Sequence, residues 1–357
     1  MKESGNSELL RYIEYQQGGL VSNGSESFIT NERDWFINSR SKIKKSLQEQ
    51  LGRNESSRLL ATKIDDFKGS TKFESFFPME LFTPILDDVA EIYKKIDISL
   101  SAQVTLFTSP SMSPGACTLP SVHGHTIFAG EGTMSFCNYW SKIFVSIVLG
   151  CASTGKVDFS DNSINNVIAD HDIGLKVFRL AAYYSQRGSL RGFGKLDEPK
   201  GAHIERASMV QAMEVFIIAH EYYHLYLEEQ YPSNNGVPPD TTEKEMELMC
   251  DSFALAVTTM FGLKHENINA TNLISPLVFF LSLDLCESAR LKLKPNAEHD
   301  DSHPSPMERV ENINKFIQSD DFPDYMKDSF ELFVRISELL RKRLDTLMEA
   351  ISDKKYA

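Results

Sequence analysis

A long apolar segment in the second half of the chain contains two histidines and a glutamate at a spacing that can hold a metal ion. The residues are His220, Glu221 and His224, in the pattern H-E-x-x-H. Positions i and i+4 lie on one face of an α-helix, so both imidazoles point at one spot. Two neutral imidazoles bind Zn²⁺ at about 2.0–2.1 Å. Glu221 follows the first histidine directly and can act as general base toward a water molecule on that metal.

The residues around this motif favour a buried helix. Residues 215–219 are apolar, and neither glycine nor proline interrupts 202–231. Such a helix can bring ligands to the floor of a cleft. The alternative is that two histidines and a glutamate occur by chance on an ordinary core helix, since a pattern with three fixed positions arises by accident.

A following helix, predicted over 242–261, offers the third protein ligand that an open zinc site requires. Glu243, Glu247 and Asp251 recur at steps of four and therefore share one face. Apolar residues surround Glu247, whereas Glu243 lies in the first turn, where the helix dipole favours acids. We predict Glu247 as the ligand and Asp251 as the residue that orients one histidine. The alternative has Glu243 on the metal and Glu247 behind it.

Two other groups of potential ligands have simpler explanations. His123 and His125 flank Gly124 beside a predicted strand, which is typical of turn and packing histidines. In the triplet at 170–172, Asp172 fits as the N-cap of a helix that reaches about residue 186. We expect neither group to bind a metal.

Composition indicates an ordinary globular protein. The 357 residues can form one large or two modest domains, with 41% hydrophobic and 24% charged side chains. A net charge of −13 argues against a general phosphate-binding surface, so we expect no nucleic-acid partner.

The polar N-terminus, the short apolar runs and the cysteine pattern together predict a cytoplasmic protein without a membrane partner. The N-terminus is polar and has no apolar segment behind it, which argues against a signal peptide. The longest apolar runs, 143–152 and 273–285, are shorter than the ~20 residues of a membrane span. The cysteines form no C-x-x-C pair and are odd in number, which predicts reduced, mostly buried thiols; they are Cys117, Cys137, Cys151, Cys250 and Cys286.

The first hundred residues predict a helical region of unknown role, which we separate as 1–100. Patterning indicates helices at 8–17, 32–51, 57–67 and 84–96. At residue 100 the pattern changes to a strand at 103–108, a short extended piece at 115–120, and a strand at 124–130. Pro114 and Pro120 bracket the middle piece, so it fits a sheet edge better than a sheet centre.

Beyond the strands the pattern is again mostly helical, with a predicted domain over 101–320. A buried helix is indicated at 138–151, and the glycine-rich segment 187–201 is typical of mobile surface that could form a lid. A long amphipathic helix at 323–353, within a final region 321–357, is expected to dock on the domain.

The order of these segments resembles that of a known protease group. With the segment 303–309, which reads His-Pro-Ser-Pro-Met-Glu-Arg, the chain resembles the gluzincin metallopeptidases of the HtpX and CAAX-prenyl protease type. That family shows two strands with an edge segment between them, then the H-E-x-x-H helix, an E-x-x-x-D helix and a His-Pro-Ser/Thr-x-x-x-Arg segment. The likeness covers about 100–320 and implies a zincin-like α+β fold. The chain departs from the family in lacking a span-length run and in having some 75 residues between the second strand and the motif helix.

His303 is the candidate for an oxyanion donor. The carbonyl oxygen of a peptide gains charge when water attacks it, and zinc peptidases add a positioned donor there. Tyr222 and Tyr223, at i+2 and i+3 from His220, are turned partly away from the metal face, and Arg309 is better explained as an anchor paired with an acid. His303 precedes a proline, which favours an extended backbone that can project the ring. An ordinary loop histidine is the alternative, and Ser305, Pro306 and Glu308 are explained by a capping box.

We therefore expect a soluble zinc endopeptidase with one Zn²⁺ per chain, acting on a protein or peptide substrate. An extended peptide would add as a strand to the edge formed by Gly115, Ala116, Cys117 and Thr118. One alternative is a protein that keeps its zinc for structure and binds partners. Another is an effector protease whose N-terminal region binds a regulatory partner or a small-molecule signal.

Overall fold

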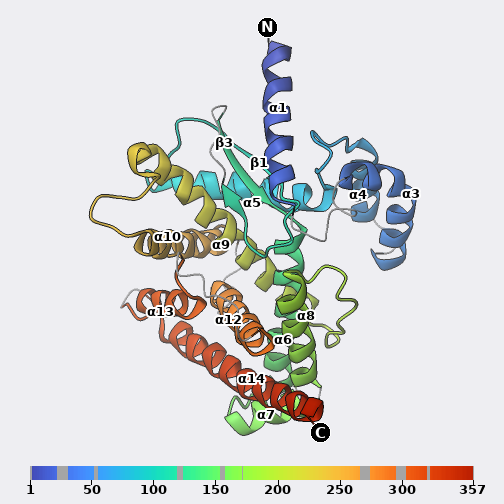
Figure 1. Ribbon diagram of the computed structural model, residues 1–357, viewed down its shortest axis with the longest axis vertical. Helices are drawn as coiled ribbons and strands as arrows, with labels where there is room; N and C mark the ends of the chain where they lie inside the picture. Colours follow the sequence, from blue (N-terminus) through green and yellow to red (C-terminus); the bar gives the residue numbers. More distant parts are fainter. Residues whose placement is uncertain are drawn as a thin grey trace.

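The computed structural model is mostly helical with one small sheet, as the α+β expectation requires (Figure 1). It describes residues 2–21, 31–51, 55–118, 124–152, 157–170, 172–265, 274–294, 303–319 and 322–356. The elements are α1 (Lys2–Gly19), α3 (Glu32–Leu51), α4 (Glu55–Asp66), α5 (Phe76–Lys95), β1 (Val104–Thr108), β2 (Cys117–Thr118), β3 (His125–Ala129), α6 (Glu131–Ala152), α7 (Asp161–Asp170), α8 (Ile173–Arg187), α9 (His203–Gln230), the short 3-10 helix η1 (Pro232–Asn234), α10 (Glu243–Lys264), α12 (Ser275–Leu293), α13 (Pro306–Ile317) and α14 (Asp324–Tyr356).

The three strands pair in the order β1–β3–β2. β1 runs parallel to β3, with Leu106 opposite Ile127, and β2 runs antiparallel to β3, with Cys117 opposite Phe128. The predicted succession of strand, short edge piece and strand is thus confirmed, and β2 lies at a sheet edge. Leu119 and Pro120, at the end of the predicted edge segment, lie outside the described residues.

The two faces of this sheet are covered by different helices. Phe107 and Phe128 pack around Ile13 of α1 on one face. Leu106 and Ile127 point to the opposite face and join the main hydrophobic core, where α5 contacts β1 and α9 contacts β3. Alternate side chains of a strand point to opposite faces, so β1 and β3 each contribute to both clusters.

Helix α9 lies at the centre of the helical part and packs against α5, α6, α10 and α12 (Figure 1). Its middle, 215–219, is buried throughout. A helix that is apolar on all sides needs neighbours on all sides, and these four helices supply them. The apolar flank of the H-E-x-x-H motif is therefore explained by burial of the whole helix.

Three predicted helix starts were wrong. The helix predicted from residue 8 begins at Lys2. The helix predicted from residue 84 begins at Phe76, with Pro84 inside it, and the helix predicted from residue 138 begins at Glu131. An internal proline removes one main-chain hydrogen bond. In α5 the burial of Phe76, Phe82 and Ile85 compensates for that loss.

Asp172 does not act as the predicted capping side chain. It precedes α8, but its backbone is left-handed, with φ of 51°, and its side chain accepts no capping hydrogen bond. His171, the middle residue of the 170–172 triplet, lies outside the described residues.

The glycine-rich segment after α8 is packed against the protein. Leu190 and Leu196 are buried within the main core. The hydroxyl of Tyr139 on α6 donates to the carbonyl of Gly194 at 2.6 Å, and Lys142 donates to the carbonyl of Leu196 at 3.1 Å. These contacts hold the described part of 187–201 against α6.

The C-terminal helix α14 packs against α7, α8 and α12 (Figure 1). Met326, Phe330, Phe333 and Leu340 from the predicted apolar stripe are buried there. The proposed boundaries at 100 and 320 stay predictions.

Among the described residues, α10 is the one helix that is long and apolar enough to cross a membrane. Of its apolar window, 56% is buried within the protein. Helix α10 packs against α5, α9 and α13, and core helices of this kind meet the same criterion of length and composition.

Candidate metal centre and cleft

Helices α9 and α10 lie side by side and bring three ligand-type side chains together. Helix α10 begins with the predicted capping box, in which the main-chain N–H of Glu245 donates to Thr242 Oγ1 at 3.2 Å and that of Thr242 donates to Glu245 Oε2 at 2.8 Å. With this start fixed, Glu247 faces α9 and is only 8% exposed. Glu243 is exposed in the first turn, so the structure does not bring it to the histidines.

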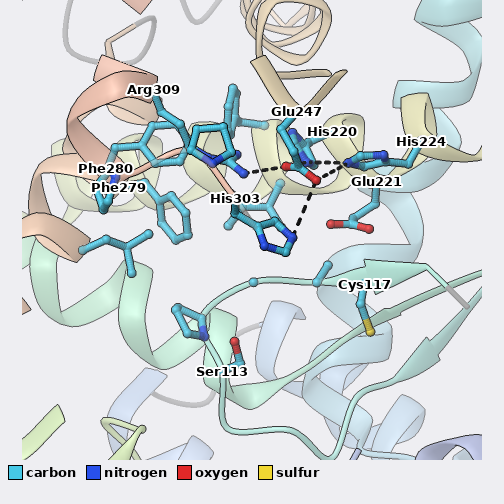
Figure 2. Close-up of a pocket in the computed structure, with 18 of the residues that line it drawn as sticks. Ser113, Cys117, His220, Glu221, His224, Glu247, Phe279, Phe280, His303 and Arg309 are labelled. Carbon is cyan, nitrogen blue, oxygen red and sulfur yellow. Dashed lines mark hydrogen bonds and ion pairs between the residues drawn. The ribbon is translucent and has the colours of Figure 1, made fainter. Parts of the chain in front are cut away.

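The three side chains meet at distances that fit a small cation (Figure 2). His220 Nε2 lies 3.0 Å from His224 Nε2 and 3.3 Å from Glu247 Oε2, and His224 Nε2 lies 3.3 Å from Glu247 Oε1. Ligand atoms about 2.0–2.1 Å from a tetrahedral ion are roughly 3.3 Å apart. Two imidazole nitrogens at contact distance need a proton or a cation between them. The set therefore has the spacing and the chemistry of a metal site.

Acidic and basic neighbours contact the three ligand-type side chains and fix their orientation. Asp251 Oδ1 lies 2.9 Å from His220 Nδ1, which is the orienting position predicted for Asp251. Arg309 of α13 donates to Asp251 Oδ1 at 2.8 Å and to Glu247 Oε2 at 2.5 Å. Arg309 thus has the anchoring contacts expected from the sequence. His224 Nδ1 lies 3.6 Å from the thiol of Cys250.

Charge is balanced within this buried cluster. Burial disfavours the charged form of His220, but its polar contacts with Asp251 and Glu247 raise its pKa to about 9. Burial opposes ionisation of Glu247 as well, yet contacts with His220 and His224 lower its pKa. A proton and a divalent cation therefore compete for the same nitrogen.

The three side chains lie on one wall of a cleft of about 630 Å³. Glu221 lines the cleft next to them, and its carboxylate points into the space between the histidines and Cys117 (Figure 2). The opposite wall is the edge segment, from which all four residues predicted to bind substrate line the cleft; they are Gly115, Ala116, Cys117 and Thr118.

Close backbone contacts place the edge segment against α6. A Cβ atom at Gly132 would lie 2.3 Å from the carbonyl oxygen of Ser113, so only glycine permits this approach. Thr133 Oγ1 also donates to the carbonyl of Gly115 at 3.3 Å. The N-terminus of α6 thus fixes the distance between the edge segment and the ligand residues.

His303 projects into the cleft from the segment before α13 (Figure 2). Its Nε2 lies 3.9 Å from Glu247 Oε1, and 60% of its side chain is exposed. The segment is positioned by the predicted capping box of Ser305 and Glu308, with Pro306 at the first helical position. His303 therefore lines the cleft next to the ligand residues.

Tyr222 and Tyr223 are turned away from the cleft. The ring of Tyr222 stacks on Tyr93 at 5.0 Å, and that of Tyr223 stacks on Phe253 at 4.1 Å. The Tyr93 hydroxyl donates to the carbonyl of Ala219 at 2.9 Å. The aromatic stack supports the motif helix on the side opposite the ligands.

The remaining candidates do not join the site. His125 Nε2 contacts the carboxylate of Glu229 outside the cleft, as expected of a packing histidine, and His123 lies outside the described residues. All five cysteines are free, and four are buried, as predicted. Cys117 is half-buried on the edge strand.

Sequence reasoning missed the apolar side of the cleft. Phe279, Phe280 and Leu283 of α12 line it, together with Phe216 of α9 and Tyr184 of α8. By its length the apolar run 273–285 indicates only that it is too short to span a membrane. Its adjacent phenylalanines were the available signal, but no local pattern tells a cleft-lining ring from a core ring.

No protein-family model, curated protein or solved structure matches this chain. The likeness to gluzincin peptidases therefore rests on the motifs and their order.

Proposed function

We propose that the protein is a zinc-dependent endopeptidase of gluzincin type with a zincin-like catalytic core. One observation carries the proposal: three ligand atoms converge on a cleft wall beside Glu221, opposite an edge strand. A set of two histidines and one glutamate is typical of catalytic zinc sites, which keep a fourth position open. A site that binds metal only for structure usually has four protein ligands.

His220, His224 and Glu247 would hold the ion, with Asp251 and Arg309 fixing their orientation. Bound Zn²⁺ supplies Lewis acidity toward water and the scissile carbonyl. Glu221 contributes no ligand atom to the set and faces the cleft, so we assign it to take a proton from water and pass it to the leaving amine. His303 would donate a hydrogen bond to the developing oxyanion.

The substrate would bind as an added strand. Residues 115–118 lie at the cleft edge of the sheet, where main-chain groups can pair with an extended peptide. Such pairing depends little on side chains and therefore suits a peptide or an unfolded protein segment. It also holds the scissile bond across the cleft, toward Glu221.

Glu221→Gln tests the proposal because it removes a base and no ligand. We expect wild-type protein purified with zinc to cleave casein in a manner blocked by 1,10-phenanthroline. In Glu221→Gln the rate should fall by about 10²–10⁴-fold, with zinc content and melting temperature retained. Glu243→Gln, an exposed carboxylate on α10, serves as the matched control and should cleave like wild type.

Loss of zinc from Glu221→Gln would contradict the assigned role and make the residue structural. Stoichiometric zinc without hydrolysis of any protein or peptide by the wild type would instead favour a non-catalytic zinc-site protein.

A further inference from the structure

The α12 side of the cleft forms an apolar compartment next to the ligand residues. Phe280 packs edge-on against Phe216 at 5.6 Å, and Phe279 packs against Phe280 at 5.4 Å. Phe279 also packs edge-on against Phe136 at 5.5 Å. Each ring is thus held by another ring, and the compartment has fixed aromatic walls.

One polar group belongs to these walls. Tyr184 of α8 lines the cleft, and its ring packs edge-on against Phe136 at 5.5 Å. Burial raises the pKa of Tyr184, so its hydroxyl stays protonated and can donate. No hydrogen bond joins this hydroxyl to another described residue, and the hydroxyl is not among the fully buried unpaired groups, so it is open to the cleft. The neighbouring Tyr183, outside the cleft, donates instead to the carbonyl of Arg191 at 2.9 Å.

A hydroxyl that is open to the cleft is hydrated in the free protein. A ligand that displaces this water must offer the hydroxyl a new hydrogen-bond partner, because otherwise the hydroxyl is buried unpaired. The guanidinium of Arg309 lies 5.3 Å from the centre of the Phe280 ring, but its charge is already engaged by the carboxylates of Glu247 and Asp251.

We propose that this compartment binds the substrate side chain beside the scissile bond, and that Tyr184 makes it select tyrosine over phenylalanine. The proposal rests on the peptidase function proposed above. A flat ring fits edge-on contacts with Phe279 and Phe280, and its terminal oxygen can pair with the Tyr184 hydroxyl. Charged side chains are excluded because they would lose their hydration without gaining a counter-charge.

The direction of the edge segment indicates whether the side chain before or after the scissile bond enters the compartment. Ser113 lies toward the Phe279 side of the cleft, and Cys117 lies toward Glu221 and His224 (Figure 2). A peptide antiparallel to this segment runs from the Cys117 end to the Ser113 end. Its residue after the scissile bond therefore enters the aromatic compartment.

The test uses zinc-loaded protein and blocked Gly/Ala peptides that contain one variable residue, either Tyr, Phe, Leu, Lys or Glu. We expect cleavage before the variable residue, with kcat/KM for Tyr about 3- to 10-fold above Phe and on the order of 100-fold above Lys or Glu. Tyr184→Phe should reduce the Tyr-to-Phe ratio of kcat/KM to about 1. Tyr183→Phe, which removes a hydroxyl outside the cleft, should keep the wild-type ratio.

A binding measurement separates this inference from the peptidase proposal. Zinc-loaded Glu221→Gln should bind the same peptides with Tyr ahead of Phe, as measured by fluorescence anisotropy, whether or not the wild type cleaves them. If Tyr peptides bind more tightly than Phe peptides but the wild type cleaves neither, the result would support the proposed side-chain compartment and contradict the proposed peptidase activity. Two results would contradict the proposed selection by Tyr184 without affecting the peptidase proposal. One is cleavage of Tyr and Phe peptides at equal rates, and the other is a Tyr-to-Phe ratio of kcat/KM that Tyr184→Phe does not change.

Discussion

Glu214 on α9, six residues before the first motif histidine, is a buried carboxyl without a partner. It is 1% exposed, and neither carboxyl oxygen has a hydrogen-bond partner among the described residues. Burial raises the pKa of Glu214 from 4.5 to about 8. The informative perturbation is Glu214→Gln, because glutamine keeps the size of the side chain and stays neutral at every pH.

The sign of the effect follows from proton binding. Between pH 4.5 and 8 the folded protein keeps a proton on Glu214 that the unfolded chain has lost. The stability associated with this group is therefore complete below pH 4.5 and is lost as pH rises through 8. One pKa unit corresponds to about 1.36 kcal/mol, so the loss between pH 5 and pH 8 is about 3–4 kcal/mol. In Glu214→Gln this loss is absent.

Urea unfolding of metal-free wild type and variant at pH 5, 6.5 and 8 measures the difference directly. We expect Glu214→Gln to gain about 3–4 kcal/mol relative to wild type from pH 5 to pH 8, with equal m-values. Glu243→Gln, at an exposed position, should show no such change. A constant difference between Glu214→Gln and wild type across this range would refute the argument, because it would mean that Glu214 ionises at its ordinary pKa in the folded protein.

Two further predictions concern the metal and the donor. Glu247→Ala should lose zinc by elemental analysis, whereas Glu243→Ala should keep it, since Glu247 joins both histidines and Glu243 is exposed in the first turn; the reverse result would reassign the third ligand. His303→Ala should lower turnover about a hundredfold with zinc content and melting temperature nearly unchanged, and His303→Gln should recover part of the loss. Wild-type turnover in His303→Ala would contradict the role of His303 as oxyanion donor. A loss of activity that is explained entirely by unfolding of the variant would contradict it as well.

The parts of the site that sequence could predict depend on helix periodicity and helix starts. His220 and His224 share a face because of the i, i+4 spacing, whatever surrounds the helix. Glu247 could be preferred over Glu243 because the capping box at Thr242 places Glu243 in the first turn, where it remains exposed. Such features are local in the chain, so their geometry follows from a few residues.

The unpredicted parts depend on contacts between distant residues. Tyr184 and Phe279 are 95 positions apart, and no spacing rule brings both rings to the same cleft. The start of α5 was missed for a related reason: Pro84 argues locally for a helix start, and only the tertiary burial of Phe76 and Phe82 overrides it. Glu214 could not be recognised either, since a glutamate in a helix pattern does not reveal whether its carboxyl meets water.

The change of pattern at residue 100 is a change of secondary structure, and side chains on its two sides contact one another. The pattern passes there from helices to strands, yet Tyr93, before the proposed boundary, stacks on Tyr222 and donates to the carbonyl of Ala219. On the face of the sheet that α1 covers, Cys117 of the edge strand packs against the cluster around Ile13 of α1. Residues before 100 therefore support both walls of the cleft, the motif helix through α5 and the edge strand through α1. Because a core is defined by contacts, periodicity alone cannot locate where one core ends and another begins.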